Sequence, residues 1–165
     1  MTDLLTQLMT ERDWLMADGA TGTTLFNMGL TSGDAPELWN VDKPDNIRAL
    51  YKGAVDAGSD IFLTNSFGGN ASRLKLHDAQ DRAYELAKAA AQVARAVADK
   101  AGRPVVVAGS IGPSGELFEP VGPVTFEQGK AAFAEQARGL IDGGADILWI
   151  ETISSREESA AAVAG

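Results

Sequence analysis

Cysteine is absent from the 165-residue chain, and histidine occurs once, at His77. The chain therefore offers no disulfide, no thiol nucleophile and no thiolate metal site, since each of these needs cysteine. A Ser-His-Asp triad would depend on His77, and no Gly-x-Ser-x-Gly nucleophile motif accompanies it. These absences exclude several common catalytic chemistries for the residues of this chain.

Positive charge and long apolar runs are also scarce. Lys and Arg total 14 against 23 Asp and Glu, which gives a net charge of −9. Such a chain is repelled by nucleic-acid phosphates and by anionic membrane surfaces. No apolar run reaches the length of a membrane span, and the N-terminus lacks the basic and apolar regions of a signal peptide. We therefore expect a cytoplasmic protein with no nucleic-acid or membrane partner.

Short apolar runs alternate with helical patterns along the whole chain, whose length suits a single domain over residues 1–165. This alternation predicts an α/β fold with parallel (β/α) units and right-handed crossovers. Strands are expected near 14–17, 60–64, 104–108 and 146–150, and helices near 44–57, 78–100, 125–142 and from 155 onward.

Several polar residues are predicted to have structural roles. Thr125 and Gln128 have the spacing of a capping box at a helix start. His77 is expected at another helix start, as a solvated or capping side chain. The acidic clusters Glu157-Glu158 and Asp34…Glu37 are typical of solvated faces. Trp39 is expected to pin its loop to the core, the alternative being a place in a ligand pocket.

Polar residues follow the predicted strands at their carboxyl ends, where parallel α/β folds bind their ligands. Asp18 follows the first strand and Glu151 the fourth. Two carboxylates at one cleft can hold an ammonium group or a metal, or can act as an acid/base pair; the alternative is that each caps a nearby helix or loop. Backbone N–H groups of the Gly-rich turn 18–22 can bind an anion. For Asn65 and Ser66, the pattern alone favours a role within the loop.

Four segments, each at a predicted strand end, resemble the homocysteine S-methyltransferase family and occur in the family's order. The resemblance extends from about Trp14 to Gly165 and is closest to bacterial betaine–homocysteine methyltransferases. The segments are Met16–Thr23 (MADGATGT), Ala57–Phe67 (AGSDIFLTNSF) with Asn70–Leu74 (NASRL), Gly109–Gly115 (GSIGPSG) and Leu148–Thr152 (LWIET).

The resemblance implies a (β/α)8 TIM barrel that transfers a methyl group to homocysteine sulfur and makes methionine, with betaine as the preferred donor. It also implies a zinc ion, held by three cysteines, that binds the sulfur as a thiolate. Carried over to this chain, Asp18 and Glu151 contact the homocysteine amino group. Gly19 and Ala20 form the turn that approaches the amino acid, and Asn65 and Ser66 line the pocket.

The chain departs from the family pattern in its second half. It matches the first four (β/α) units, a half-barrel, and has none of the zinc cysteines. We therefore expect substrate-binding residues here but no catalytic or metal-binding residue. A four-stranded parallel sheet has two open edges, so we expect a homo-oligomer or pairing with a C-terminal half. Two alternatives are a non-catalytic half-barrel that self-associates and an unrelated phosphate- or carboxylate-binding enzyme that uses Asp18 and Glu151.

Overall fold

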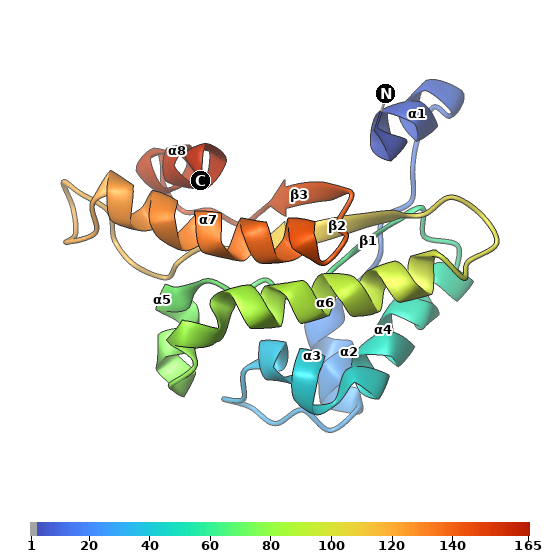
Figure 1. Cartoon of the computed structure of the whole chain (residues 1–165), viewed down its shortest axis with the longest axis horizontal. Helices are drawn as coiled ribbons and strands as arrows, with labels where there is room; N and C mark the ends of the chain where they lie inside the picture. Colours follow the sequence, from blue (N-terminus) through green and yellow to red (C-terminus); the bar gives the residue numbers. More distant parts are fainter. Residues whose placement is uncertain (1–2) are drawn as a thin grey trace.

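The computed structural model describes residues 3–165 (Figure 1). Three short parallel strands alternate with helices in the predicted α/β order. The strands are β1 (Ile61–Leu63), β2 (Val106–Ile111) and β3 (Ile147–Ile150). The helices are α1 (Leu4–Glu11), α2 (Thr21–Asn27), α3 (Trp39–Asp42), α4 (Pro44–Asp56), α5 (Ala71–Leu74), α6 (Ala83–Ala98), α7 (Phe126–Asp142) and α8 (Arg156–Ala164), and 3-10 turns span Pro36–Leu38, Lys75–His77 and Gln80–Arg82.

The strands form one sheet in the order β1-β2-β3, and every pairing is parallel. In register, Phe62 lies opposite Val107, and Ala108 lies opposite Ile147. Alternate residues of a strand point to opposite faces. Phe62 and Val107 therefore face the helices, whereas Ala108 and Ser110 face the other side. Because all pairings are parallel, the carboxyl ends of the three strands lie together at one end of the sheet.

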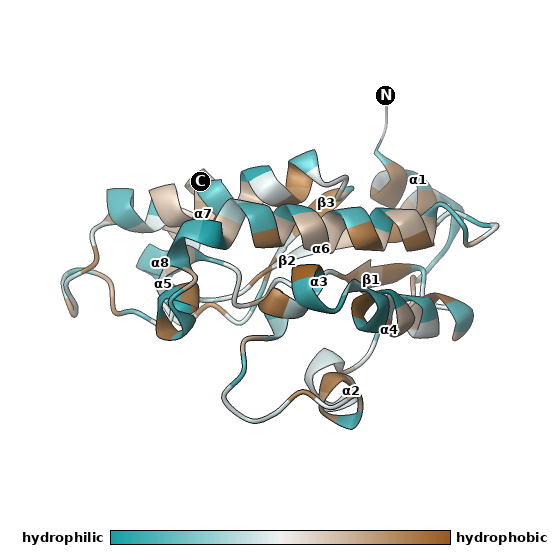
Figure 2. Ribbon diagram, turned by 60° about the horizontal axis from the view of Figure 1, so that its bottom comes forward, coloured by the Kyte–Doolittle hydropathy of each residue, from teal (hydrophilic) through white to brown (hydrophobic). Residues whose placement is uncertain are grey.

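Helices α4, α6 and α7 cover one face of the sheet (Figure 1). Figure 2 shows that α4 and α6 carry hydrophobic and hydrophilic residues side by side, as expected for helices with one buried face. Tyr51 of α4 and Phe62 of β1 meet in the core between them, with ring centroids 5.2 Å apart. On the opposite face, Leu8 of α1 packs against Ile61 and Val106.

The first predicted strand is the main correction to the expected four-unit half-barrel. The segment 14–17 forms only an isolated parallel bridge, between Ala17 and Ile61. Trp14 is 69% and Met16 is 51% exposed, so the segment is not the buried strand that its apolar run predicts. Among the described strands it pairs with β1 alone, and the Asp60 carboxylate holds it by accepting the Met16 N–H at 3.0 Å. An edge segment with a single partner has fewer ladder hydrogen bonds to keep it extended.

The helix signals were more accurate. Pro44 is the first residue of α4, and the capping box between Thr125 and Gln128 is present at the start of α7. The helix expected over 78–100 begins only at Ala83, because two 3-10 turns precede it. His77 ends the first of these turns and so lies outside the helix that it was expected to begin. Trp39 is 6% exposed within the core, which agrees with its predicted role in fixing the loop.

β2 also extends further than predicted. The expected loop at 109–115 begins three residues later, because Gly109, Ser110 and Ile111 continue the ladder opposite Leu148, Trp149 and Ile150. No helix within residues 3–165 is long and apolar enough to span a membrane.

Candidate functional site

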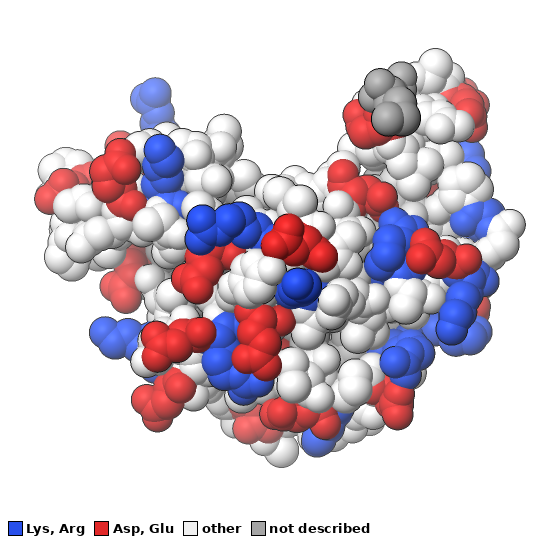
Figure 3. Space-filling view, in the orientation of Figure 1, with Lys and Arg blue, Asp and Glu red and all other residues white. Residues whose placement is uncertain are grey.

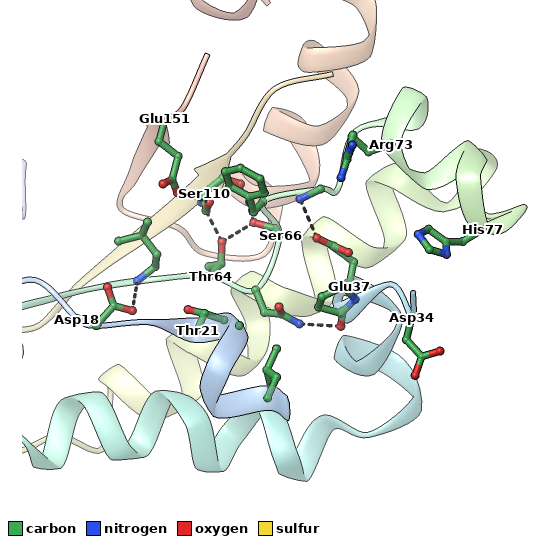
Figure 4. Close-up of a pocket in the computed structure, with 18 residues that line it drawn as sticks. Asp18, Thr21, Asp34, Glu37, Thr64, Ser66, Arg73, His77, Ser110 and Glu151 are labelled. Atoms are coloured by element: carbon green, nitrogen blue, oxygen red, sulfur yellow. Dashed lines mark hydrogen bonds between the residues drawn. The ribbon is translucent and has the colours of Figure 1, made fainter. Parts of the chain in front are cut away.

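A cavity of about 440 Å³ lies at the carboxyl ends of the strands. Its volume falls within the range of small-molecule pockets. The cavity has charged residues at two ends, shown in Figure 4. Asp18 and Glu151 make up what we call the acidic end, and Asp34, Glu37, Arg73 and His77 make up the mixed-charge end.

Asp18 is positioned by hydrogen bonds to β1. Its backbone N–H donates to the Ile61 carbonyl at 3.0 Å, and its carboxylate Oδ2 accepts the Leu63 N–H at 3.1 Å. The side chain is half-buried, and burial raises the pKa of Asp18. The negative charge of Glu151 contributes to the same rise, which places the two carboxylates within electrostatic reach of each other.

Glu151 follows β3 on the other side of β2. Its backbone N–H donates to the Ile111 carbonyl at 3.0 Å. The Ser110 hydroxyl donates to its Oε1 at 2.7 Å, which orients the carboxylate toward the cavity that both residues line. The structure thus brings Asp18 and Glu151 to one cavity, as the strand-end rule predicted.

Ser66 lines the cavity, but its hydroxyl is already used within the protein. It donates to the Ser110 carbonyl at 2.8 Å and lies 2.6 Å from the Thr64 hydroxyl oxygen. Gln136, from α7, donates from Nε2 to the Ser66 carbonyl at 2.6 Å. Ser66 is 1% exposed, so its polar groups tie the ends of β1 and β2 together.

Asn65 lines the same cavity and has an equally dense set of partners. Its backbone N–H donates to the Tyr51 hydroxyl at 2.6 Å. Its side-chain Nδ2 donates to the Pro36 carbonyl at 2.8 Å and to Asn40 Oδ1 at 3.0 Å. These bonds hold the 3-10 turn at Pro36 and helix α3 against the end of β1. Both Asn65 and Ser66 therefore shape the wall of the cavity, whatever contact they make with a ligand.

The Gly-rich turn leads directly into α2. Gly19 lines the cavity, and an ideal Cβ built on it would meet no atom within 4 Å. Ala20 is the N-cap residue of α2 and lies outside the set of residues that line the cavity. The next two residues, Thr21 and Gly22, do line the cavity. Of the two turn residues expected at the substrate, only Gly19 borders the space where a ligand would lie.

Glu37 contradicts the prediction that its acidic cluster is a solvated face. Asp34 is exposed, but Glu37 is only 6% exposed and borders the cavity. Its Oε1 accepts the Gly68 N–H at 2.7 Å. Burial raises the pKa of Glu37, and hydrogen bonds from backbone N–H groups, including that of Gly68, oppose the rise. His77 is exposed as predicted, yet it also lines the cavity.

Glu158 is the second correction of this kind, since it is 1% exposed. Its Oε1 accepts the Ser114 N–H at 2.7 Å and the Ser114 hydroxyl at 2.5 Å. Its Oε2 accepts the Ser154 N–H at 3.3 Å and the Ser154 hydroxyl at 3.1 Å. Burial acts to raise the pKa of Glu158, but these hydrogen bonds outweigh it and the pKa is lowered. The side chain joins the loop after β2 to the loop after β3.

The residues of this chain do not fit a zinc site of the family's kind. The sequence has no cysteine, and across residues 3–165 no three His, Asp or Glu side chains gather closely enough to hold a metal ion. Asp18 and Glu151 are two carboxylates without a third ligand, which favours an ammonium group over a metal ion as their partner.

Comparisons with known proteins find relatives that match nearly the whole chain. Methionine synthases from Mycobacterium tuberculosis and Mycobacterium leprae are 35% and 34% identical to the chain over 173 residues. The match covers 99% of this chain but 14% of each relative, so the chain spans a small part of their length.

Solved structures show the same relationship. The homocysteine methyltransferase MmuM from Escherichia coli, in its oxidized form, matches with a TM-score of 0.82 and 25% identity over 99% of this chain and 61% of that one. Its metallated form matches with a TM-score of 0.81 and 26% identity over 98% of this chain and 62% of that one. Residues 15–165 match the model of the homocysteine S-methyltransferase family. The chain therefore belongs to the homocysteine S-methyltransferase family.

Proposed function

We propose that this chain binds homocysteine by its amino group and provides the amino-acid-binding part of a homocysteine S-methyltransferase that makes methionine. The observation that carries the proposal is the acidic end of the cavity. Asp18 and Glu151 come from opposite sides of β2, and Glu151 helps to raise the pKa of Asp18. An ammonium group placed between two half-buried carboxylates relieves their repulsion and replaces lost hydration.

The neighbouring residues support the same placement. The absence of a side chain at Gly19 lets the amino acid approach the backbone of the turn, and Ala20 completes that turn. The walls made by Asn65 and Ser66 are held rigidly by their hydrogen bonds, so they limit the shape of the space beside the amino acid. We propose that Asp18, Gly19, Asn65, Ser66 and Glu151 border the bound homocysteine, with the charged contacts made by Asp18 and Glu151, and that Ala20 acts only by shaping the turn.

The proposal extends to the methyl donor and to the metal. We propose betaine as the donor, on the likeness of the four strand-end segments to betaine-type members of the family. Zinc, where the family uses it, converts the homocysteine thiol to a thiolate. Because the residues described here do not fit zinc, we propose that the metal-binding cysteines are supplied by a different polypeptide segment, and that this chain orients the amino acid.

The open edges of the sheet support an association of this kind. β3 pairs with β2 alone among the described strands, and its Leu148 and Trp149 are 38% and 37% exposed. Figure 3 shows a notch between the α1 and α8 regions, on the side of the molecule where Figure 1 places β3. We propose that a C-terminal half, or a second copy in a homo-oligomer, covers this edge in the cytoplasm.

A second candidate is a half-barrel that self-associates without methyl transfer. The lack of cysteine together with the exposed Trp149 favours it. The two functions differ in one respect that can be measured, because a purely structural half-barrel has no reason to bind homocysteine. The third alternative, an unrelated phosphate- or carboxylate-binding enzyme, is wrong because the chain belongs to the homocysteine S-methyltransferase family.

The test is calorimetric titration of the purified chain with homocysteine. Asp18→Asn and Glu151→Gln should each weaken binding by about ten- to a hundredfold, since each removes a charged hydrogen bond of about 1.5–3 kcal/mol. Asp13→Asn and Glu127→Gln, both at exposed sites outside the cavity, are matched controls and should bind like the wild type. Unchanged affinity in both cavity variants, or no binding to the folded wild-type chain, would contradict the proposal.

A further inference from the structure

Two helices of this chain begin with the same four-residue pattern but use its last residue differently. At the start of α7, the Gln128 side chain accepts the Thr125 N–H at 2.9 Å, so the pattern closes on itself as a capping box. At the start of α8, the Ser155 hydroxyl oxygen accepts the Glu158 N–H at 3.1 Å, but the Glu158 carboxylate is directed to two loops outside the helix. Capping of α8 therefore does not account for this carboxylate.

The Glu158 carboxylate joins the two loops that follow the strand ends of Ser110 and Glu151. Its Oε1 accepts the N–H and the hydroxyl of Ser114, which lies four residues after Ser110 on the loop after β2. Its Oε2 accepts the N–H and the hydroxyl of Ser154, three residues after Glu151 on the loop after β3. Ser110 and Glu151 are themselves hydrogen-bonded and lie side by side at the acidic end of the cavity (Figure 4). Glu158 thus fixes the two loops that continue from this bonded pair.

The loop after β3 has a strained backbone directly beside Glu151. Thr152 has a φ of +59°, in the left-handed region that is unfavourable for a side chain branched at Cβ. Such a conformation persists only where surrounding contacts maintain it. Beyond the bend, Ile153 packs against a core cluster that includes residues of α7, and Glu158 holds Ser154. Because the bend begins at the residue after Glu151, these contacts also fix the backbone from which the Glu151 side chain extends.

A carboxylate suits this position because both of its oxygens accept hydrogen bonds. Glu158 is 1% exposed, and no ion pair within residues 3–165 includes it. A buried charge is costly unless its bonds offset the lost hydration, and the lowered pKa of Glu158 agrees with strong bonding. A glutamine in its place has one accepting oxygen, so it can hold one of the two loops but not both.

We propose that Glu158 is a positioning residue for homocysteine binding, which holds the Glu151 carboxylate in the orientation that pairs with the ligand's ammonium group. Glu158 lies outside the set of residues that line the cavity and acts through Ser114 and Ser154. The inference rests on the proposed function and adds a residue that sets the preference for a ligand with an amino group. Charge-assisted hydrogen bonds depend on distance and angle, so displacement of Glu151 weakens the amino-group contact selectively.

The experiment measures, by calorimetric titration, the ratio of the affinities for homocysteine and for 4-mercaptobutanoate, an analogue that lacks the amino group. Partial unfolding of a variant lowers both affinities by the same factor, so the ratio reports on the amino-group contact. Glu158→Gln should reduce the wild-type preference for homocysteine by about three- to tenfold. Ser154→Ala, a milder change at an exposed residue, should reduce it by about two- to threefold. Glu157→Gln, at the exposed neighbouring position, is the control and should keep the wild-type ratio.

A double variant separates positioning of Glu151 from a general structural role. If Glu158 acts through Glu151, Glu158→Gln has no further effect on the ratio once Glu151→Gln has removed the carboxylate. If Glu158→Gln does not fold, Ser154→Ala takes its place in the same comparison. Equal reductions in both backgrounds, or an unchanged ratio in Glu158→Gln and Ser154→Ala while Glu151→Gln lowers it, would overturn the positioning role and leave the proposed function standing. A wild-type chain that binds homocysteine no more tightly than the analogue would overturn both.

Discussion

Glu37 and Glu158 are two buried carboxylates from acidic clusters, and they differ in how completely their oxygens are hydrogen-bonded. Glu158 accepts bonds on both oxygens, from Ser114 and Ser154. Glu37 accepts a single bond and borders a cavity. The pKa of Glu158 is lowered, whereas burial raises the pKa of Glu37. Burial alone therefore does not separate a ligand-binding acid from a structural one. The number of carboxylate oxygens without a hydrogen-bond partner in the protein is the more informative feature.

The largest expected effect is the loss of stability when Glu158, whose two carboxylate oxygens are both hydrogen-bonded, is replaced. Glu158→Ala leaves the N–H and hydroxyl groups of the buried Ser114 and of the more exposed Ser154 without their acceptor. We expect the free energy of unfolding to fall by about 3–5 kcal/mol, because the two buried donors of Ser114 lose a charged partner at once and the bonds to Ser154 are lost with them. Urea denaturation monitored by circular dichroism measures the change. Glu157→Ala, at the exposed neighbouring position, is the control and should change stability little. A loss below about 1 kcal/mol would show that Glu158 is not structural.

Dependence on pH sharpens the same contrast, because the two pKa shifts have opposite signs. The pKa of Glu158 is lowered from its ordinary value of 4.5, so its stabilising contribution is complete above that pH. The contribution is lost as pH falls through the folded-state pKa. The stability difference between wild type and Glu158→Gln should accordingly be constant from pH 7 to about 5 and shrink at lower pH. A difference that instead grows on acidification would contradict the assigned sign.

For Glu37 the sign is reversed. Its pKa is raised from 4.5, so its contribution to stability is greatest below that pH and is lost as pH rises through the folded-state pKa. The stability of Glu37→Gln relative to the wild type should therefore increase from pH 4 toward pH 7. Paired urea titrations at several pH values measure this trend. A flat profile would indicate that Glu37 has the same pKa in the folded and unfolded chain.

A smaller effect is expected when a support of the acidic end is removed. Ser110→Ala deletes the hydroxyl that donates to Glu151 Oε1. Homocysteine affinity should fall by about two- to tenfold, the worth of one ordinary hydrogen bond. Calorimetric titration gives the value, and Ser159→Ala on α8 is a control outside the cavity. A loss as large as that of Glu151→Gln would mean that Ser110 itself contacts the ligand.

The smallest effect is expected for the partly bonded member of the pair at neutral pH. Glu37→Gln keeps an oxygen that can accept the Gly68 N–H and removes a buried charge. We expect the free energy of unfolding at pH 7 to rise by less than about 1 kcal/mol relative to the wild type, because the substitution removes a buried charge. Urea denaturation again provides the measurement. A loss of several kcal/mol would place Glu37 with Glu158 as a structural acid.

The sequence was informative where local signals decide the structure. The capping box at Thr125 and Gln128 and the helix start at Pro44 are local patterns, and both were predicted. The meeting of Asp18 and Glu151 at one cavity followed from the rule that the ends of parallel strands lie together. That rule needs only the order of strands and helices, which the hydrophobic pattern carries.

Features that depend on distant contacts were missed. Glu37 and Glu158 lie in polar segments that predict exposure, and their burial depends on Gly68 and Ser114, which are far away in the sequence. The apolar segment 14–17 has the composition of a buried strand but pairs only with β1 among the described strands. The hydrophobic pattern of a segment indicates that it favours a buried strand. The number of strands that it can pair with depends on the rest of the fold.

The most direct test of the central claim compares homocysteine with 4-mercaptobutanoate, which is the same molecule without its amino group. Both are titrated calorimetrically into the wild-type chain and into Asp18→Asn. The account predicts that the wild type binds homocysteine about ten- to a hundredfold more tightly than the amine-free compound, and that Asp18→Asn loses most of this preference. Equal affinity of the wild type for the two compounds would contradict the assignment of Asp18 and Glu151 to the amino group.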